Sequence, residues 1–435
     1  MIPFQLKFTQ VQWPRLKQWT FRLAEFGFVQ GLVQLLTALA GFMIVRHMAK
    51  PEYALFAIVN GMQAACNLLA DLGIGIGVRS IGGRVCDDRA RFGQLINTAL
   101  GLRRRFAMLS LSVCLPVTMW MLWRNRASGI EIIALSSLVV VGVFPLLSAS
   151  VFSVSAQLHH EYRRMQKVEF GNAVVRVGLI GVLALSRMNA WLAASVGVIS
   201  NWVAAFFFRR WAGEHADLTA PHNETDHHEL KRLSMQSLPN TIFFCFQGQV
   251  TLLILTLVGN HNGIADITAI GRIAALLTVA NVVFVNVLAP RFNRCQDTER
   301  LPRLYLMLVA GMATVLTPLL LVAWLYPAPL LWLLGDKYAN LQSECVWVVA
   351  ASSLGLIAGV MWTLNSSKAW IRLQAIGYIP IILTAQAIAA ACLDFRQFHD
   401  VLIFNLVSVA APIPMFLLDA YAGLRKARTL TSVPA

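Results

Sequence analysis

The chain has 435 residues, of which 57% are hydrophobic and 13% charged, with 36 Lys and Arg against 21 Asp and Glu. Because about 25% of the residues in a soluble domain are charged, this composition excludes an ordinary soluble protein and indicates an integral membrane protein. The seven cysteines are scattered singly without CxxC or Cys/His clusters, so neither a zinc site nor a disulfide framework is expected.

Twelve apolar segments are each long enough to cross a bilayer core of about 30 Å, which takes about 20 helical residues. They cover approximately residues 25–45, 53–77, 106–123, 131–154, 170–187, 189–208, 238–259, 265–289, 304–325, 344–364, 373–393 and 399–421. The sequence therefore predicts an all-α integral membrane protein with about 12 transmembrane helices in two six-helix bundles related by a pseudo-two-fold axis along the membrane normal. The expected units are a basic interfacial lead 1–24, a first bundle 25–208, a linker 209–237, a second bundle 238–421 and a tail 422–435.

Lys and Arg are distributed unequally between the two sides of the predicted membrane. The connections on the side of the N-terminus hold 27 of them and those on the opposite side hold 7, while Arg176 and Arg272 fall inside predicted helices. Because positive residues concentrate on the cytoplasmic side, both termini are predicted to be cytoplasmic. The same distribution accounts for the basic charge without nucleic acid as a partner. Outer connections are short, and the longest, 326–344, is predicted to be an interfacial segment.

The second predicted helix carries a polar stripe on one face. Asn60, Gln63, Asn67 and Asp71 follow one another at i, i+3, i+7 and i+11. Such a stripe at membrane depth faces a cavity or binds neighbouring helices through hydrogen bonds, and four polar groups ending on an acid favour a cavity wall. Asp71 is the best acid for coupling to an ion or proton; the alternative is a structural acid that pairs with an arginine or caps a helix.

Two arginines, Arg176 and Arg272, lie inside predicted helices, one turn after Asn172 and Thr268 respectively. An intramembrane arginine snorkels to the interface or faces a cavity or a carboxylate, and few acids are available here. In a cavity the two would form a positive field suited to phosphate, which a guanidinium binds bidentately. Arg46 and Arg79 mark the two ends of the striped helix and are expected to be entry and exit contacts.

The first and seventh predicted helices carry uncharged polar residues at helical spacing. These are Gln30, Gln34 and Thr37 in the first helix and Asn240, Gln247 and Thr251 in the seventh, which Pro239 is predicted to open. Amides and hydroxyls along a channel suit sugar hydroxyls, and they equally suit helix packing. All nine histidines fall in loops or at helix ends, and no HExxH, P-loop or nucleophile-elbow motif occurs. We therefore expect no enzyme, no metal and no cofactor.

Several short motifs, taken together, carry a family resemblance. They are Arg46, Pro51-Glu52-Tyr53, Asp71-Leu72-Gly73 and Arg79 in the first half, and Pro239, Gly271-Arg272 and Pro290-Arg291 in the second. With the twelve-helix plan, the chain resembles the polysaccharide-transporter family, which includes the Wzx-type O-antigen flippases. This family belongs to the multidrug/oligosaccharidyl-lipid/polysaccharide (MOP) exporter superfamily. The chain departs from the family pattern at Ala54, where members usually have glycine.

The resemblance implies two six-helix bundles that form a V around a central cavity. It also implies transfer of an undecaprenyl-pyrophosphate-linked oligosaccharide from the inner to the outer leaflet of the bacterial inner membrane, for O-antigen, capsule or exopolysaccharide assembly. The implied partners are the lipid bilayer, this polyprenyl-linked substrate and other polysaccharide-assembly membrane proteins. Under the resemblance, the pyrophosphate would be attracted by Arg46, Arg79, Arg176 and Arg272. The sugar path would be lined by Gln30, Gln34, Asn60, Gln63, Asn67, Gln247 and Thr251.

Four other functions are weighed against this one. A cation-coupled drug or metabolite antiporter of the same superfamily would extrude cations, which cavity arginines and scarce acids suit poorly. A lipid II flippase resembles fourteen-helix chains rather than twelve. An integral-membrane glycan polymerase or glycosyltransferase would need a substantial loop with catalytic acids or histidines. A purely structural membrane subunit would leave the polar stripes as packing contacts.

Overall fold

The structure is a computed structural model that describes residues 13–431 apart from 160, 187, 296 and 298, and no strand occurs in that part of the chain. Part of the predicted lead (1–12) and of the predicted tail (432–435) lies outside the described residues. The first half of the chain forms α1 (Trp13–His47), α2 (Lys50–Asp71), α3 (Ile74–Val85), α4 (Arg89–Arg124), α5 (Gly129–Leu158), α6 (Tyr162–Ala184) and α7 (Ala190–His215).

The second half begins with a long helix and continues with shorter pieces. It forms α8 (Glu224–Val258), α9 (His261–Ala274), η1 (Ala275–Leu277), α10 (Thr278–Val283), the π-helix η2 (Phe284–Leu288), α11 (Ala289–Arg294), α12 (Leu301–Leu325), α13 (Pro327–Leu334), η3 (Asp336–Tyr338), α14 (Gln342–Ser367), α15 (Arg372–Cys392), α16 (Phe398–Ala410) and α17 (Ile413–Thr431).

Each of the twelve predicted segments is mostly helical in the described part of the chain. Among the described residues, eleven helical stretches are long and apolar enough to cross a membrane. The remaining predicted segment is α6, whose membrane portion carries Lys167, Glu169 and Arg176 and is correspondingly less apolar. It nevertheless packs lengthwise between α1 and α7 as a member of the bundle.

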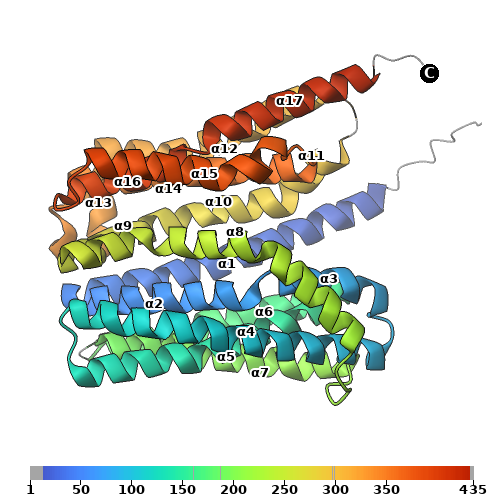
Figure 1. The fold of residues 1–435 in the computed structure, drawn as a ribbon, viewed down its shortest axis with the longest axis horizontal. Coiled ribbons are helices and arrows are strands. Elements are labelled where there is room, and N and C mark those ends of the chain that lie inside the picture. Colours follow the sequence, from blue (N-terminus) through green and yellow to red (C-terminus); the bar gives the residue numbers. More distant parts are fainter. Residues whose placement is uncertain (1–12, 160, 187, 296, 298, 432–435) are drawn as a thin grey trace, which may run out of the picture.

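The helices are arranged in two lobes, which Figure 1 shows as a blue-to-green layer (α1–α7) and a yellow-to-red layer (α9–α17), with α8 passing between them. Inside the first lobe α5 packs against α4 and α7, and α1 packs against α6. Inside the second, α14 packs against α12 and α16.

One hydrophobic core is shared by both lobes, and other cores belong to one lobe each. The shared core contains the end of α1 and the start of α2 (Ile44, Ile58) together with residues of α9 and α13 (Ile270, Leu334). At the opposite ends of the helices, one separate core lies in the first lobe and two lie in the second. The hydrophobic core that joins the lobes therefore lies at one end of the helices, which confirms the predicted V of two bundles.

The second predicted span is broken, which corrects the expectation of one helix over 53–77. α2 ends at Asp71, and Leu72 and Gly73 both have positive φ, 40° and 78°. A Cβ on Gly73 would lie 2.9 Å from the Ser237 hydroxyl of α8, so glycine meets both the backbone and the packing requirement. The chain restarts as α3, which lies against α4, α5 and α8.

Two helices begin well before the predicted positions because polar side chains cap them. The Asp88 carboxylate accepts the backbone N–H groups of Ala90 and Arg91, at 3.0 and 3.1 Å, so α4 starts at Arg89 rather than at 106. Asn223 caps α8 in the same way. The prediction that Pro239 opens the seventh helix is therefore wrong, since this proline lies inside α8. An interior proline removes one helix hydrogen bond, and α8 bends on its way from the first lobe to the second (Figure 1).

Candidate functional site

A polar face of α6 lies toward α1. Glu169, Asn172 and Arg176 follow at i, i+3 and i+7, and each has a buried atom without a hydrogen-bond partner: Oε2, Oδ1 and Nε respectively. The facing residue of α1 is Gln30, whose side chain is within hydrogen-bonding reach of Glu169 and whose own Oε1 is buried and unpartnered. Buried polar atoms are rarely left unsatisfied, so this α1–α6 cluster is suited to bind water or a polar ligand.

Arg272 approaches the same region from α9 in the second lobe. Its Nε donates a hydrogen bond to the hydroxyl of the fully buried Tyr53 at 3.3 Å. Its stem lies against α1 at Gly41, where a Cβ would be 3.3 Å from Arg272 Cδ, so the missing side chain leaves room for the arginine. The positive charges of Arg176 and Arg272 repel each other. Within the described part of the chain, neither arginine has a carboxylate ion pair, and a positive field lies between the lobes.

Polar contacts between the lobes surround this region at the end where α1 stops and α2 starts. Lys50 forms a salt bridge of 2.8 Å with Asp266 of α9. Asn125 at the end of α4 lies 2.7 Å from the His261 ring at the start of α9. These contacts hold the V closed at the end that the charge distribution predicts to be outside.

Arg46 and Arg79 are not brought to the arginine pair. Arg46 is exposed at the end of α1, where it donates to the Trp332 carbonyl at 3.3 Å and stacks over the Trp332 ring at 4.9 Å. It thereby holds α13, which lies in the segment 326–344 and buries Leu331 and Leu334 in the shared core. Arg79 is exposed on α3 toward the opposite end of the molecule. The four predicted arginines therefore lie in three separate places: Arg46 at one end of the helices, Arg79 toward the other end, and Arg176 with Arg272 in a third.

Asp71 lies in a bonded arrangement at the end of α2. Its carboxylate forms a salt bridge with Arg103 of α4 and accepts the backbone N–H of Gly75 at 3.1 Å, which caps the start of α3. Arg103 is buried and also donates to the Leu147 carbonyl at 3.0 Å and to the hydroxyl of Ser150. This is the paired and capping acid that the sequence left open as an alternative, and a coupling role for Asp71 stays a prediction.

The amides of the predicted stripe are divided between packing and exposure. Gln63 lies against α5 at Gly142, with its Nε2 buried and unpartnered, and the Oδ1 of Asn67 is likewise unpartnered. Asn60 is exposed. On α8, Gln249 donates to the Gly61 carbonyl of α2 at 3.1 Å and joins the lobes. Gln34 and Thr251 are half-buried on α1 and α8.

Gln247 lies in a cavity of about 380 Å³ inside the second lobe. Its Oε1 accepts a hydrogen bond of 2.9 Å from Gln386, whose Nε2 also lies 3.0 Å from the Ser408 hydroxyl. Aromatic rings make up much of the wall and come from four helices, namely Phe244, Trp362, Tyr378 and Phe416. A cavity with ring faces and a bonded amide pair can stack against a sugar ring or another flat or apolar group while hydrogen-bonding its edge.

Sequence reasoning missed three residues of these polar clusters, two of them because the predicted helix boundaries excluded them. Glu169 lies just before the predicted start at 170, and Arg103 just before the predicted start at 106, although both belong to helices. Glu169 could have been found from its helical spacing to Asn172 and Arg176. Arg103 could have been placed in a helix from the capping residue Asp88. Gln386 had no signal beyond being a polar residue in an apolar helix.

The arrangement of the helices in two lobes is similar to the fold of solved MATE transporter structures. An inward-facing multidrug-resistance MATE structure is similar with a TM-score of 0.71 and 15% identity, covering 92% of this chain and 96% of that chain. An outward-facing structure of such a transporter gives 0.56 at 15% identity, covering 95% and 96%. A eukaryotic MATE transporter gives 0.54 at 9% identity, covering 93% and 99%.

At the sequence level, neither a family model nor a curated protein matches the chain. The structural similarity at these identities establishes the fold alone.

Proposed function

We propose that the protein moves an undecaprenyl-pyrophosphate-linked oligosaccharide from the inner to the outer leaflet of the bacterial inner membrane, for O-antigen, capsule or exopolysaccharide assembly. The observation that carries the proposal is the pair Arg176 and Arg272, contributed by different lobes and free of carboxylate partners among the described residues. A pyrophosphate would neutralise both arginines at once and relieve their mutual repulsion. A cationic drug would add another positive charge and increase this repulsion.

Two polar regions, the α1–α6 cluster and the cavity around Gln247, support a glycan as cargo. The α1–α6 cluster supplies unpartnered amide and carboxylate oxygens, which accept hydrogen bonds from sugar hydroxyls. The cavity around Gln247 supplies aromatic faces. The polyprenyl chain would stay in the bilayer while the charged and hydroxylated parts pass between the lobes.

The conformation fits loading from the cytoplasm. The lobes meet at the end that the positive-inside distribution predicts to be external, and the fold resembles an inward-facing MATE structure more closely than an outward-facing one, with TM-scores of 0.71 and 0.56. In this orientation both termini are cytoplasmic and the open end of the V faces the leaflet in which lipid-linked glycans are presented.

Drug efflux is a second function with specific support. Solved MATE structures with this fold are described as multidrug-resistance transporters, and Glu169 provides an acid in the first lobe. Under this alternative Glu169 would receive a cation or proton, and both arginines would be structural. The two functions differ in the sign of the cargo charge.

The test is export of lipid-linked glycan in cells that lack the gene, measured as surface polysaccharide and as the leaflet location of the undecaprenyl-linked intermediate. We expect loss of surface glycan and accumulation on the cytoplasmic face. Normal surface glycan with increased sensitivity to cationic compounds would overturn the flippase proposal in favour of drug efflux.

Complementation with arginine variants then assigns the roles. Arg176→Gln and Arg272→Gln each remove one charge-assisted contact with phosphate, which is worth about 1.5–3 kcal/mol, so export should fall about tenfold or more. Lysine at either position keeps the charge and should retain more export. Arg396→Gln, in an exposed loop, is the matched control for a lost arginine. Full export by Arg176→Gln and Arg272→Gln at normal protein levels would show that these arginines do not contact the cargo.

A further inference from the structure

The first lobe has a groove on its outer side, away from the second lobe. Two adjoining cavities of about 350 and 320 Å³ lie between α4, α5 and α7. Both are lined by Leu100, Arg104, Ser148, Trp202 and Arg209. Figure 1 places α5 and α7 at the face of the first lobe opposite the second lobe, so the groove is separate from the space between the lobes. It therefore faces surrounding lipid.

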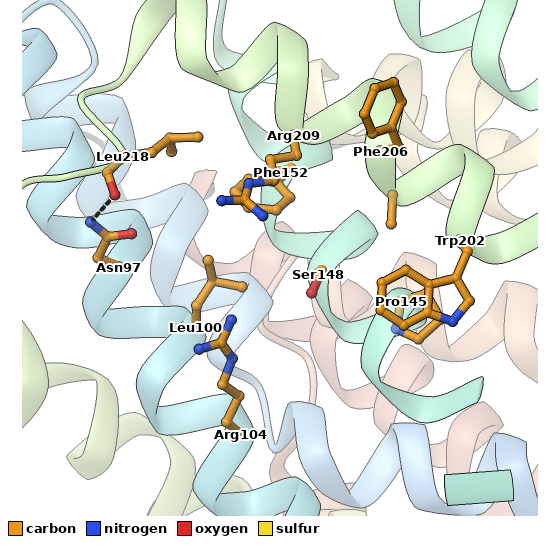
Figure 2. A pocket seen from close by; sticks show the side chains of 11 residues that line it. Asn97, Leu100, Arg104, Pro145, Ser148, Phe152, Trp202, Phe206, Arg209 and Leu218 are labelled. Carbon is orange, nitrogen blue, oxygen red and sulfur yellow. Dashed lines mark hydrogen bonds between the residues drawn. The ribbon is translucent and has the colours of Figure 1, made fainter. Parts of the chain in front are cut away.

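Besides Arg103, which lines one of the cavities and pairs with Asp71, two arginines reach into this groove from different helices (Figure 2). Arg104 extends from α4 and Arg209 from α7, with Ser148 of α5 between them. Both arginines are exposed, and neither forms a hydrogen bond or an ion pair with the other described residues. No Asp or Glu is among the residues that line the two cavities. The groove therefore carries two positive charges that have no protein counter-charge.

The depth of the arginines along their helices corresponds to a membrane interface. Arg104 lies two residues before the apolar part of α4, which begins at Phe106, and about 20 residues, or roughly 30 Å of helix, separate it from Arg124 at the other end. Arg209 directly follows the apolar run of α7. Both guanidinium groups thus lie where lipid phosphates are found, on the side to which the sequence assigns most Lys and Arg.

The remaining groove wall is apolar and aromatic. Trp202 and Phe206 are more than half exposed on α7, and Phe152 and Pro145 of α5 line the interior. A tryptophan at the headgroup level is typical of interfacial anchoring, and the apolar wall continues toward the hydrocarbon. A single ligand with a phosphate at one end and an acyl chain at the other would neutralise the arginines and also cover the apolar wall.

We propose that this groove binds an anionic glycerophospholipid of the cytoplasmic leaflet. The phosphodiester would be held between the forks of Arg104 and Arg209, which match phosphate geometry, and an acyl chain would lie along Trp202 and Phe206. The site is distinct from the path proposed for the cargo and uses none of its residues. It requires only that α4, α5 and α7 cross the membrane in the orientation predicted by the charge distribution.

The test compares phosphatidylglycerol with phosphatidylcholine on the purified full-length protein in detergent. Bound lipid is counted by native mass spectrometry, and thermal unfolding is followed as each lipid is titrated. The double variant Arg104→Gln/Arg209→Gln removes the proposed contacts. Arg105→Gln/Arg210→Gln removes the same charge from neighbouring positions on the same helices, and those residues line neither cavity.

For the wild type we expect saturable binding of phosphatidylglycerol and a stabilisation that phosphatidylcholine does not give. The groove variant should bind phosphatidylglycerol about a hundredfold more weakly, because two charge-assisted contacts are lost, while the control variant should match the wild type. Equal preference for the two lipids, or equal loss in both double variants, would overturn the proposal. Stabilisation by inorganic phosphate alone, without any lipid effect, would also overturn it.

A second variant keeps the test decisive if the glutamine pair does not fold. Ser148→Leu fills the floor of the groove and leaves both arginines in place. We expect it to lose phosphatidylglycerol binding as well, since the headgroup would be displaced. Unchanged binding by Ser148→Leu would show that the lipid, if bound, lies elsewhere.

Discussion

Replacing Asp71 with asparagine separates a structural role from a role in ion coupling. In the structure this carboxylate compensates the charge of Arg103, whose side chain is 4% exposed, against 33% for that of Asp71. Asparagine keeps the size and a carbonyl that can still accept the Gly75 N–H. The variant therefore removes the charge while it preserves the cap at the start of α3.

The expected cost follows from the environment of Arg103. Breaking a buried ion pair by removing one partner costs about 3–5 kcal/mol, because the other charge is left without compensation. Arg103 retains the Leu147 carbonyl and the Ser150 hydroxyl, and Asp71 is partly exposed, so we expect the lower end, about 3 kcal/mol. The double variant Asp71→Asn/Arg103→Met removes both charges and should recover much of that loss, because a long apolar side chain replaces the arginine stem.

The assay is thermal unfolding in detergent for the wild type, both single variants and the double variant, combined with transport normalised to folded protein. We expect the single variants to unfold several degrees lower, the double variant to lie between them and the wild type, and normalised transport to persist in Asp71→Asn. An Asp71→Asn protein with wild-type stability and no transport would refute the structural reasoning and support ion coupling at this acid.

Two further predictions concern packing and pH. Gly93→Ala should be strongly destabilising, by about 1–3 kcal/mol or more, because the added Cβ would lie 2.0 Å from the Asp217 carbonyl oxygen. The control is Gly83→Ala, whose added Cβ would have no atom within 4 Å. Equal melting temperatures of the two variants would contradict this packing. Burial and the charge of Lys50 lower the pKa of Lys337 from 10.5 to about 8. The folded protein disfavours the charged form of the Lys337 amine. The contribution of Lys337 to folding stability is therefore complete above pH 10.5 and is lost as the pH falls toward 8. The melting temperature should therefore rise between pH 8 and 10.5, and the rise should be smaller in Lys337→Met. If the wild type and Lys337→Met had identical pH profiles of melting temperature, Lys337 would be excluded as the cause.

The sequence alone determined the helices and the two-lobe plan, because hydropathy, segment length and interhelical connections are properties of neighbouring residues. It also located Arg176 and Arg272 inside helices, since a charge within an apolar run is visible without a fold. Helix ends were less predictable. A polar helix start such as Arg89–Arg105 looks like a loop to a hydropathy scan, and only the cap at Asp88 indicates otherwise.

Only the tertiary structure decided which polar groups meet. Arg176 and Arg272 are 96 positions apart in the chain, and their proximity depends on how the second lobe packs against α1 at Gly41. The four residues of the α2 stripe share one helix face, yet Asp71 bonds to α4, Gln63 packs against α5 and Asn60 is exposed. Periodicity defines a face of a helix. The neighbours of that face vary along the helix because α2 passes several helices in turn, and that arrangement is a property of the packed molecule.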